Sequence, residues 1–194
     1  MDDQPPVDRW LVVGLGNPGS KYAGNRHNVG QMVLATLAHR TPTGFRNHRG
    51  NAAVAASGPS ILAVPNTFMN ASGAPVAALL RFYGLEPERL IVVHDELDIP
   101  FDSLRLKHGG GHGGHNGLRD IIATIGTGDF TRVRVGIGRP PGRQDAADFV
   151  LRDFNADERQ VLPVLLSDAA DAAALVIAEG LLAAQLKFHS ARPQ

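Results

Sequence analysis

Apolar residues recur along the chain in short runs that are separated by polar and glycine-containing turns. Runs rich in Val, Ile and Leu, or alternating with polar residues, predict strands at residues 10–15, 52–56, 61–64, 90–94, 104–107 and 131–137. Apolar positions at helical spacing predict helices at residues 29–40, 72–83, 116–125 and 157–188, the last as one or two helices. Because strands and helices alternate without a long linker, the pattern predicts an α/β fold in one domain.

The strand predicted at residues 131–137 has a distinctive alternation. Arg132 and Arg134 alternate with Val133, Val135 and Ile137. Since successive side chains of a strand point to opposite faces, this strand is predicted to bury one face and to present a polar one.

The composition narrows the class of protein. A length of 194 residues, with 43% hydrophobic and 20% charged residues, is typical of one domain with a sizeable core. The absence of cysteine excludes disulfides, iron–sulfur clusters and a cysteine nucleophile. No apolar run approaches the roughly 20 residues that span a bilayer, and the acidic, proline-containing residues 1–9 are unlike a signal peptide. We therefore expect a cytoplasmic protein with no membrane partner, in which residues 1–9 form a flexible N-terminal extension.

The formal net charge is zero, but the charges are segregated along the chain. No Asp or Glu occurs between Arg9 and Leu85, whereas acidic residues dominate residues 144–180. The basic part predicts a positive face that binds a polyanion, unless folding intermixes the two regions.

Residues 14–19, Gly-Leu-Gly-Asn-Pro-Gly, directly follow the first predicted strand. A dinucleotide-binding loop has this glycine spacing, but it also requires an acidic residue about 20 positions later, and none occurs before Glu86. Pro18 also lacks a backbone N–H where a phosphate would need one. The segment is interpreted as a tight turn, either purely structural or presenting Asn17 to a ligand.

Two further segments place ionisable groups at the ends of predicted elements. Arg26-His27-Asn28 precedes a helix, so His27 either packs there structurally or acts as a base. His94-Asp95-Glu96-Leu97-Asp98 ends a buried strand, a position where carboxylates often serve function in α/β folds. These carboxylates could orient a histidine, bind Mg²⁺ or form a solvated turn.

Two loops contain the remaining candidate functional residues. Residues 108–117 contain three histidines among many glycines, which suggests either a metal site or a flexible lid, although such a loop pre-organises metal ligands poorly. Residues 65–70, Pro-Asn-Thr-Phe-Met-Asn, could hold a nucleotide, but Phe68 and Met69 could equally join the core and Asn70 could cap a helix. The chain has no G-x-S-x-G, Walker or H-E-x-x-H motif.

Together the motifs resemble bacterial-type peptidyl-tRNA hydrolases. The resemblance covers residues 11–151 and rests on the ordered set GLGNPG, KYAGNRHNVG, PNTFMNASG, HDELD, RLKHGGGHGGHNGL and FTRVRVGIGRP. It implies one peptidyl-tRNA hydrolase-like α/β domain over residues 1–194, with a twisted mixed central sheet flanked by helices and with C-terminal helices. Asn25 stands where the family commonly has threonine, and we expect no consequence for the chemistry.

The resemblance also implies a function and a site. It implies a carboxylic ester hydrolase that releases peptide from tRNA after translation stalls, without metal or cofactor, with His27 as general base, Asp95 as its support and Asn17 distinguishing a blocked amino group from a free one. The residues implied in substrate binding are Tyr22, Phe68, Met69, Asn70 and Asn116, with Lys107 and Arg134 contacting phosphates. The implied protein is a monomer that binds the CCA end and acceptor stem of peptidyl-tRNA.

Three alternatives stay open beside this hypothesis. A non-catalytic RNA-binding relative of the same fold is disfavoured because the chain retains His27, Asp95, Asn17 and Asn70. A metal-dependent hydrolase would use His94, Asp95, Asp98 and the histidines of the glycine-rich loop. A nicotinamide-dependent enzyme is disfavoured by the missing acidic residue.

Overall fold

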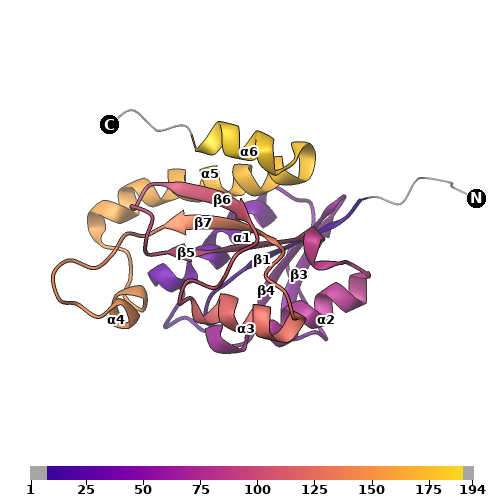
Figure 1. The fold of residues 1–194 in the computed structure, drawn as a ribbon, viewed down its shortest axis with the longest axis horizontal. Helices are drawn as coiled ribbons and strands as arrows, with labels where there is room; N and C mark the ends of the chain where they lie inside the picture. The colour runs from indigo at the N-terminus through magenta and orange to yellow at the C-terminus, as the bar shows by residue number, and fades with distance from the viewer. Residues whose placement is uncertain (1–7, 190–194) are drawn as a thin grey trace, which may run out of the picture.

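A computed structural model describes residues 8–189, so residues 1–7 of the predicted N-terminal extension lie outside the described part. A mixed seven-stranded sheet forms the centre, in the order β2-β3-β4-β1-β5-β7-β6 (Figure 1). The strands are β1 (Trp10–Gly14), β2 (Arg46–His48), β3 (Ala52–Ser57), β4 (Ser60–Pro65), β5 (Leu90–Glu96), β6 (Leu104–His108) and β7 (Thr131–Gly136). Strands β4, β1, β5 and β7 are parallel, whereas β2, β3 and β6 pair antiparallel.

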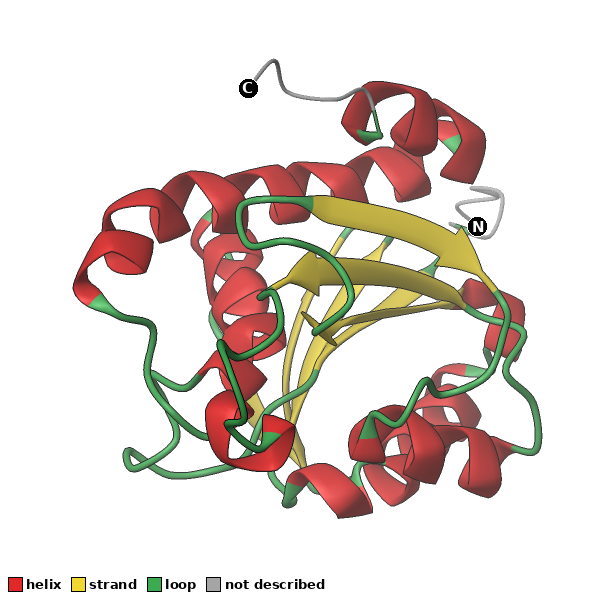
Figure 2. Ribbon diagram, turned by 60° about the vertical axis from the view of Figure 1, so that its left-hand side comes forward, coloured by secondary structure: helices red, strands yellow, loops and turns green. Residues whose placement is uncertain are grey.

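Helices cover both faces of this sheet (Figure 2). The helices are α1 (Val29–His39), α2 (Gly73–Tyr83), α3 (Asn116–Ile125), α4 (Ala146–Val150), α5 (Ala156–Glu179) and α6 (Leu181–Phe188), with short 3-10 turns η1 (Arg26–Asn28), η2 (Met69–Ala71) and η3 (Pro87–Arg89). Helices α1 and α5 pack on one face, and α2 and α3 on the other. The predicted α/β fold, with a mixed sheet, flanking helices and C-terminal helices, is confirmed.

The central strands are apolar on both sides because both of their faces are covered. Val12 of β1 points into the core beneath α1, whereas Leu11 and Val13 point into the core above α2. All three side chains are fully buried. This double burial explains why β1 and β5 are continuous apolar runs in the sequence.

Two short elements were absent from the sequence-based prediction. Strand β2 has three residues and is largely exposed, so it carries no apolar run. Helix α4 has five residues and begins after Asp145, whose side chain accepts a hydrogen bond from the N–H of Ala147. The long helical stretch divides into α5 and α6 at Gly180, which adopts a φ of 93° that favours glycine.

Helix α5 corrects the expectation that no segment is long and apolar enough to cross a membrane. Its 24 residues meet that criterion by length and composition. The helix contacts α1, α6 and β7, and Leu165, Ala169 and Val176 are buried in the core. Asp171, on its exposed side, forms an ion pair with Arg40 of α1. Helix α5 is therefore a packing helix of the α/β fold, with one buried and one polar side.

The polar face predicted for β7 is only partly exposed. The side chain of Arg132 is buried, and its guanidinium group donates hydrogen bonds to the carbonyl oxygens of Gly110, Gly111 and Gly128. The cation also lies 4.7 Å from the ring centroid of Phe130. Arg132 therefore anchors the glycine-rich loop to the sheet, and the polar face predicted for this strand is partly buried against that loop.

The carboxyl ends of β1, β4 and β5 lie at one edge of the sheet, because these neighbouring strands are parallel. Asn17 follows β1, Phe68 follows β4, and Asp95 lies near the end of β5. Helix α1 approaches the same edge closely at Gly30, where a Cβ atom would collide with the carbonyl oxygen of Val93. This close approach brings the turn before α1, which carries His27, against the end of β5.

Candidate active site

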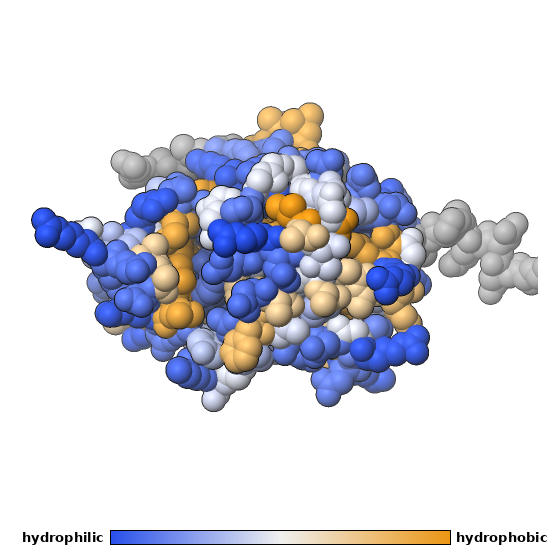
Figure 3. Space-filling model, turned by 60° about the horizontal axis from the view of Figure 1, so that its bottom comes forward, coloured by the Kyte–Doolittle hydropathy of each residue, from blue (hydrophilic) through white to orange (hydrophobic). Residues whose placement is uncertain are grey.

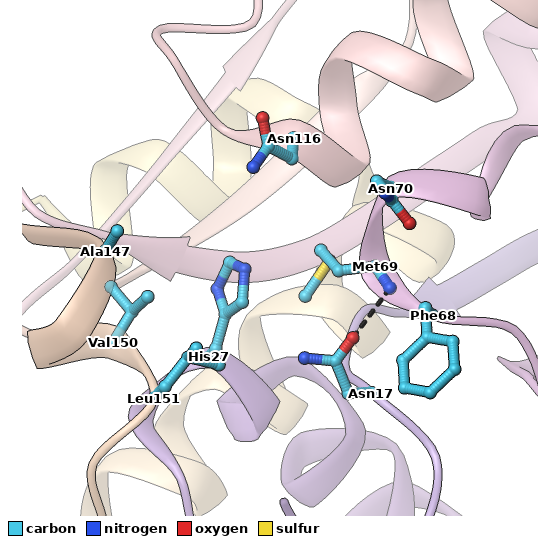
Figure 4. A pocket seen from close by; sticks show the side chains of 9 residues that line it. All are labelled: Asn17, His27, Phe68, Met69, Asn70, Asn116, Ala147, Val150 and Leu151. Atoms are coloured by element: carbon cyan, nitrogen blue, oxygen red, sulfur yellow. Dashed lines mark hydrogen bonds between the residues drawn. The ribbon is translucent and has the colours of Figure 1, made fainter.

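A cavity of about 420 Å³ opens at this edge of the sheet (Figure 4). It is lined by Asn17, His27, Phe68, Met69, Asn70, Asn116, Ala147, Val150 and Leu151. The first six of these were predicted as site residues from the sequence. They come from the loop after β1, from η1, from the segment around η2 and from the first residue of α3. The fold therefore brings together groups that lie far apart along the chain.

Asp95 lies directly behind His27. Nδ1 of His27 is 2.9 Å from Oδ2 of Asp95 and 3.0 Å from Oδ1. Because a carboxylate accepts hydrogen bonds, Nδ1 carries the proton and donates it to Asp95. Nε2 of His27 then has a free lone pair, and it makes no hydrogen bond to any residue of the described chain. The predicted pairing of these two residues has the geometry required for a general base.

His115 is a second histidine on the same carboxylate, and the sequence suggested it only as one of the loop histidines of a possible metal site. Its Nε2 lies 2.8 Å from Oδ1 of Asp95, and its Nδ1 accepts hydrogen bonds from the N–H groups of Gly117 and Leu118. Two donors facing Nδ1 place the proton on Nε2, which donates to Asp95. The signal in the sequence was the position of His115 immediately before a helix, where the side chain caps the first turn.

The carboxylate of Asp95 and the protonated form of His27 stabilise each other. Burial alone would raise the pKa of Asp95, but His27 and His115 hold it far below its usual range. Burial alone would lower the pKa of His27, but the attraction of the Asp95 carboxylate and its hydrogen bond raise the pKa above the ordinary value. Asp95 is therefore an anion that stabilises the protonated form of His27.

His94 belongs to a different environment, although it precedes Asp95. Its side chain is fully buried, and its Nδ1 donates to the backbone oxygen of Asp95 at 2.7 Å. Burial, with the neighbouring His115, lowers the pKa of His94 to about 3, so the ring is neutral. His94 does not line the cavity, and Asp98 forms an ion pair with Arg139.

A metal site built on His94 and Asp98 therefore has no support in the structure. Candidate ligand atoms of His27, Asp95 and His115 do lie within 4.8 Å of one another. However, a metal on Nε2 of His115 would require the proton on Nδ1, which faces two backbone N–H donors. The donor set fits a chain of hydrogen bonds better than a metal ion.

Asn17 is held rigidly at the floor of the cavity. Its Oδ1 accepts a hydrogen bond of 2.7 Å from the N–H of Met69, and its backbone N–H and carbonyl are both paired with the Asn28 side chain. With Oδ1 held by this bond, the Nδ2 group is the free donor of the side chain, and it points toward His27 (Figure 4). The interpretation of residues 14–19 as a turn that presents Asn17 is thus supported. Asn17 faces the cavity as a hydrogen-bond donor.

Asn70 and Asn116 bring two further amides to the cavity, and neither side chain makes a hydrogen bond within residues 8–189. Asn70 lies in η2 and does not cap α2, which has no side-chain cap. Phe68 is 57% exposed at the rim, and the Tyr22 ring packs edge-on against it with centroids 6.3 Å apart. An aromatic surface therefore borders a group of free amides.

Comparisons with known proteins identify the family. The family model described as peptidyl-tRNA hydrolase matches residues 11–194. The chain belongs to the peptidyl-tRNA hydrolase family. It is 65% identical over 188 residues to the peptidyl-tRNA hydrolase of Leifsonia xyli, covering 94% of this chain and 97% of the relative. It is 60% identical over 185 residues to that of Frankia casuarinae, covering 93% and 94%.

Comparison with solved structures identifies the same family. The crystal structure of peptidyl-tRNA hydrolase from Acinetobacter baumannii is 34% identical, with a TM-score of 0.87, and the match covers 97% of this chain and 98% of the other. The family match also includes the alanine-rich C-terminal helices, which extends the resemblance beyond residue 151.

One wall of the site in this member of the peptidyl-tRNA hydrolase family comes from α4, which the sequence did not predict. Arg26, next to His27, connects that wall to the rest of the protein. Its guanidinium group forms an ion pair with Glu158 at 2.7 Å and lies 4.1 Å from the ring centroid of Phe149. Asn25 also donates a hydrogen bond of 2.7 Å to Asp153. These contacts position the turn that carries His27.

Lys107 and Arg134 do not line the cavity but lie on adjacent strands, β6 and β7. Partial burial, together with the positive charges of Arg134 and Arg132, lowers the pKa of Lys107. Because positive charges held close together repel each other, an anion that binds between them stabilises the cluster. In this peptidyl-tRNA hydrolase family member, Lys107 and Arg134 therefore form a basic pair on the sheet, with the buried Arg132 adding positive charge beside them.

Proposed function

We propose that this chain is an enzyme that hydrolyses the ester bond between peptide and tRNA in peptidyl-tRNA. Its products would be a free peptide and a reusable tRNA, recovered from molecules that leave stalled ribosomes. The observation that carries the proposal is the His27–Asp95 pair at the cavity, with Nδ1 committed to the carboxylate and Nε2 free. Such an imidazole can activate a water molecule near neutral pH.

In the proposed reaction, Nε2 of His27 takes a proton from water as the oxygen attacks the ester carbonyl. The resulting imidazolium is stabilised by the Asp95 carboxylate, 2.9 Å from Nδ1. The tetrahedral intermediate then collapses, and the imidazolium returns the proton to the ribose oxygen as the ester bond breaks. The acid product carries the peptide, and His27 is neutral again.

The amide groups are proposed to stabilise the negative oxygen of the intermediate. Asn70 and Asn116 have free side-chain N–H groups at the cavity, where charge develops. Each donor of this kind is worth several kcal/mol in other enzymes, about 3 on average. Met69 fills the space between them and supplies the N–H that orients Asn17.

Asn17 is proposed to discriminate a blocked amino group from a free one. Its available group is a donor, Nδ2, which can pair with the carbonyl of an acylated amine. A free α-ammonium offers only donors, so it would face Asn17 without a hydrogen bond and lose its hydration. Free aminoacyl-tRNA would therefore be rejected.

The terminal nucleotide of the CCA end is proposed to pack against Phe68 and Tyr22 at the rim. Lys107 and Arg134 are proposed to contact phosphates of the acceptor stem, with Arg132 adding positive charge nearby. We further infer a cytoplasmic monomer, folded as one domain over residues 1–194, that requires neither metal nor cofactor. The tautomer of His115 supports the absence of a metal requirement.

The test compares release of an N-acetylated amino acid from tRNA with release of the free amino acid, in excess EDTA. Rapid release of only the blocked substrate is the expected result. The His27→Ala variant should retain tRNA binding and lose hydrolysis by about 10²–10⁴-fold. Binding without release by the wild-type protein would indicate a non-catalytic RNA-binding relative. Release that requires an added divalent ion would indicate a metal-dependent hydrolase.

A further inference from the structure

A second cavity opens beside the reaction cavity and shares two of its walls. It has a volume of about 370 Å³ and is lined by Asn70, Asn116, Arg119, Asp120 and Ala123. Asn70 and Asn116 face both cavities, so a molecule bound at His27 can continue into the second one without a break. Apart from these two amides, no residue of the second cavity has a role in the proposed reaction.

Arg119 is the cation of this second cavity. It lies three residues after Asn116 on α3, so the two side chains are neighbours on one helix face. Its guanidinium group is exposed and forms no ion pair or hydrogen bond within the described chain. Oδ2 of the adjacent carboxylate, Asp120, accepts the N–H of Gly73 at the start of α2, and Asp120 forms no ion pair with Arg119 in the described part of the chain. Arg119 is therefore available for an anionic ligand.

A third cavity, which shares His27 and Asn116 with the reaction cavity, has different charges. That space of about 310 Å³ is lined partly by Glu96, Asp98 and Arg139. Arg139 is committed to Asp98 at 2.7 Å, so it does not offset Glu96. A phosphodiester leaving the reaction cavity is consequently favoured on the Arg119 side, where an unpaired cation balances the single carboxylate of Asp120 and lies one helical turn from Asn116.

Figure 3 looks onto the side of the molecule that carries α2 and α3, where hydrophilic residues lie among apolar ones. The lining of the second cavity itself, with two amides, an arginine and a carboxylate, suits a ribose-phosphate backbone better than an apolar peptide side chain. Asn116, Arg119 and Ala123 of α3 form one wall of this cavity, so a nucleotide chain bound there would run along the helix.

We propose that the cavity between Asn116 and Ala123 binds the penultimate nucleotide of the tRNA, with Arg119 contacting the phosphate that joins the last two nucleotides. This assignment rests on the proposed function and adds a binding site to it. Arg119 supplies the planar fork of donors that matches a phosphate. The peptide would then occupy the third cavity, which is lined by His27 and Glu96.

The test uses two short substrates that differ by one phosphate. One is the N-acetyl-aminoacyl ester of adenosine, and the other is the same ester of the dinucleotide cytidylyl-adenosine. We expect kcat/KM of the wild-type protein to be about tenfold higher for the dinucleotide. In Arg119→Gln this ratio should fall to about one, and Arg119→Lys should restore part of it.

Arg81→Gln is the matched control, because Arg81 is an exposed arginine of α2 without an ion pair among the described residues. Its ratio should equal that of the wild type. An unchanged ratio in Arg119→Gln would overturn the assignment, as would equal losses on both substrates. A wild-type protein that prefers neither ester would overturn it while leaving the hydrolase function intact.

A second measurement applies to full-length substrate if the short esters react too slowly. The slope of log kcat/KM against log salt concentration should decrease by about 0.7 in Arg119→Gln, as expected for one lost contact to single-stranded phosphate. The slope should not change in Arg81→Gln. An identical slope in both variants would refute the phosphate contact. If the wild-type protein releases nothing from full-length peptidyl-tRNA, the hydrolase function itself fails.

Discussion

Replacing Asp95 by asparagine tests the tautomer on which the proposed base depends. In the wild-type protein, Oδ1 accepts the proton of His115 Nε2 at 2.8 Å, and Oδ2 lies 2.9 Å from His27 Nδ1. In Asp95→Asn, the remaining oxygen must stay opposite His115, because that ring cannot change tautomer while Nδ1 accepts two backbone N–H groups. The new NH2 group then faces Nδ1 of His27.

The retained oxygen also lies 3.0 Å from Nδ1 of His27 in the wild-type protein, but it is committed to the proton of His115. The new donor therefore makes Nδ1 of His27 accept, which moves the ring proton to Nε2. The nitrogen that should accept a proton from water is then blocked. We expect kcat to fall by about 10³–10⁴-fold, or roughly 4–5.5 kcal/mol of transition-state stabilisation, with little change in KM. Single-turnover release of an N-acetylated amino acid from tRNA measures this loss.

The pH profile provides an independent readout. The base works only when it is neutral, so wild-type activity falls as the pH drops through the raised pKa of His27. The variant lacks the carboxylate that raises this pKa, while burial still lowers it, so the acid limb of the residual activity should shift to lower pH. Asp171→Asn, in an exposed ion pair with Arg40, is the control and should change neither quantity. A kcat of Asp95→Asn within tenfold of wild type would refute the tautomer argument.

Three further predictions concern binding, specificity and stability. Arg26→Met leaves Glu158 without its buried partner. The free energy of unfolding, measured in urea, should therefore fall by about 3 kcal/mol, and a loss below about 1 kcal/mol would contradict the anchoring role. Asn17→Asp keeps the acceptor for the N–H of Met69 but replaces the free donor. The preference for blocked over free aminoacyl-tRNA should therefore drop at least about tenfold. An unchanged ratio of the two rates would exclude Asn17 as the discriminating residue. Lys107→Ala should weaken binding of all tRNAs about equally and reduce the slope of log binding constant against log salt concentration by about 0.9. Filter binding at several salt concentrations measures this slope, and an unchanged slope would rule out the phosphate contact.

The sequence determined most of the framework. The apolar runs at residues 10–15 and 90–94 became the buried strands β1 and β5, since only strands covered on both faces require continuous apolar residues. The motifs that ended these strands supplied Asn17 and Asp95, and the carboxyl ends of neighbouring parallel strands must meet at one edge.

Tertiary structure decided how these groups work together. The pairing of His115 with Asp95 joins a strand to a helix start 20 residues later, and no local pattern specifies such a contact. The burial of Arg132 also depends on carbonyl groups of the glycine-rich loop, so alternation alone predicted a polar face but not what covers it. Local sequence sets where elements begin and which face is apolar, whereas hydrogen-bond partners and charge environments depend on segments that meet only after folding. The tautomer of His27, on which the proposed chemistry depends, is one of the features that only folding decides.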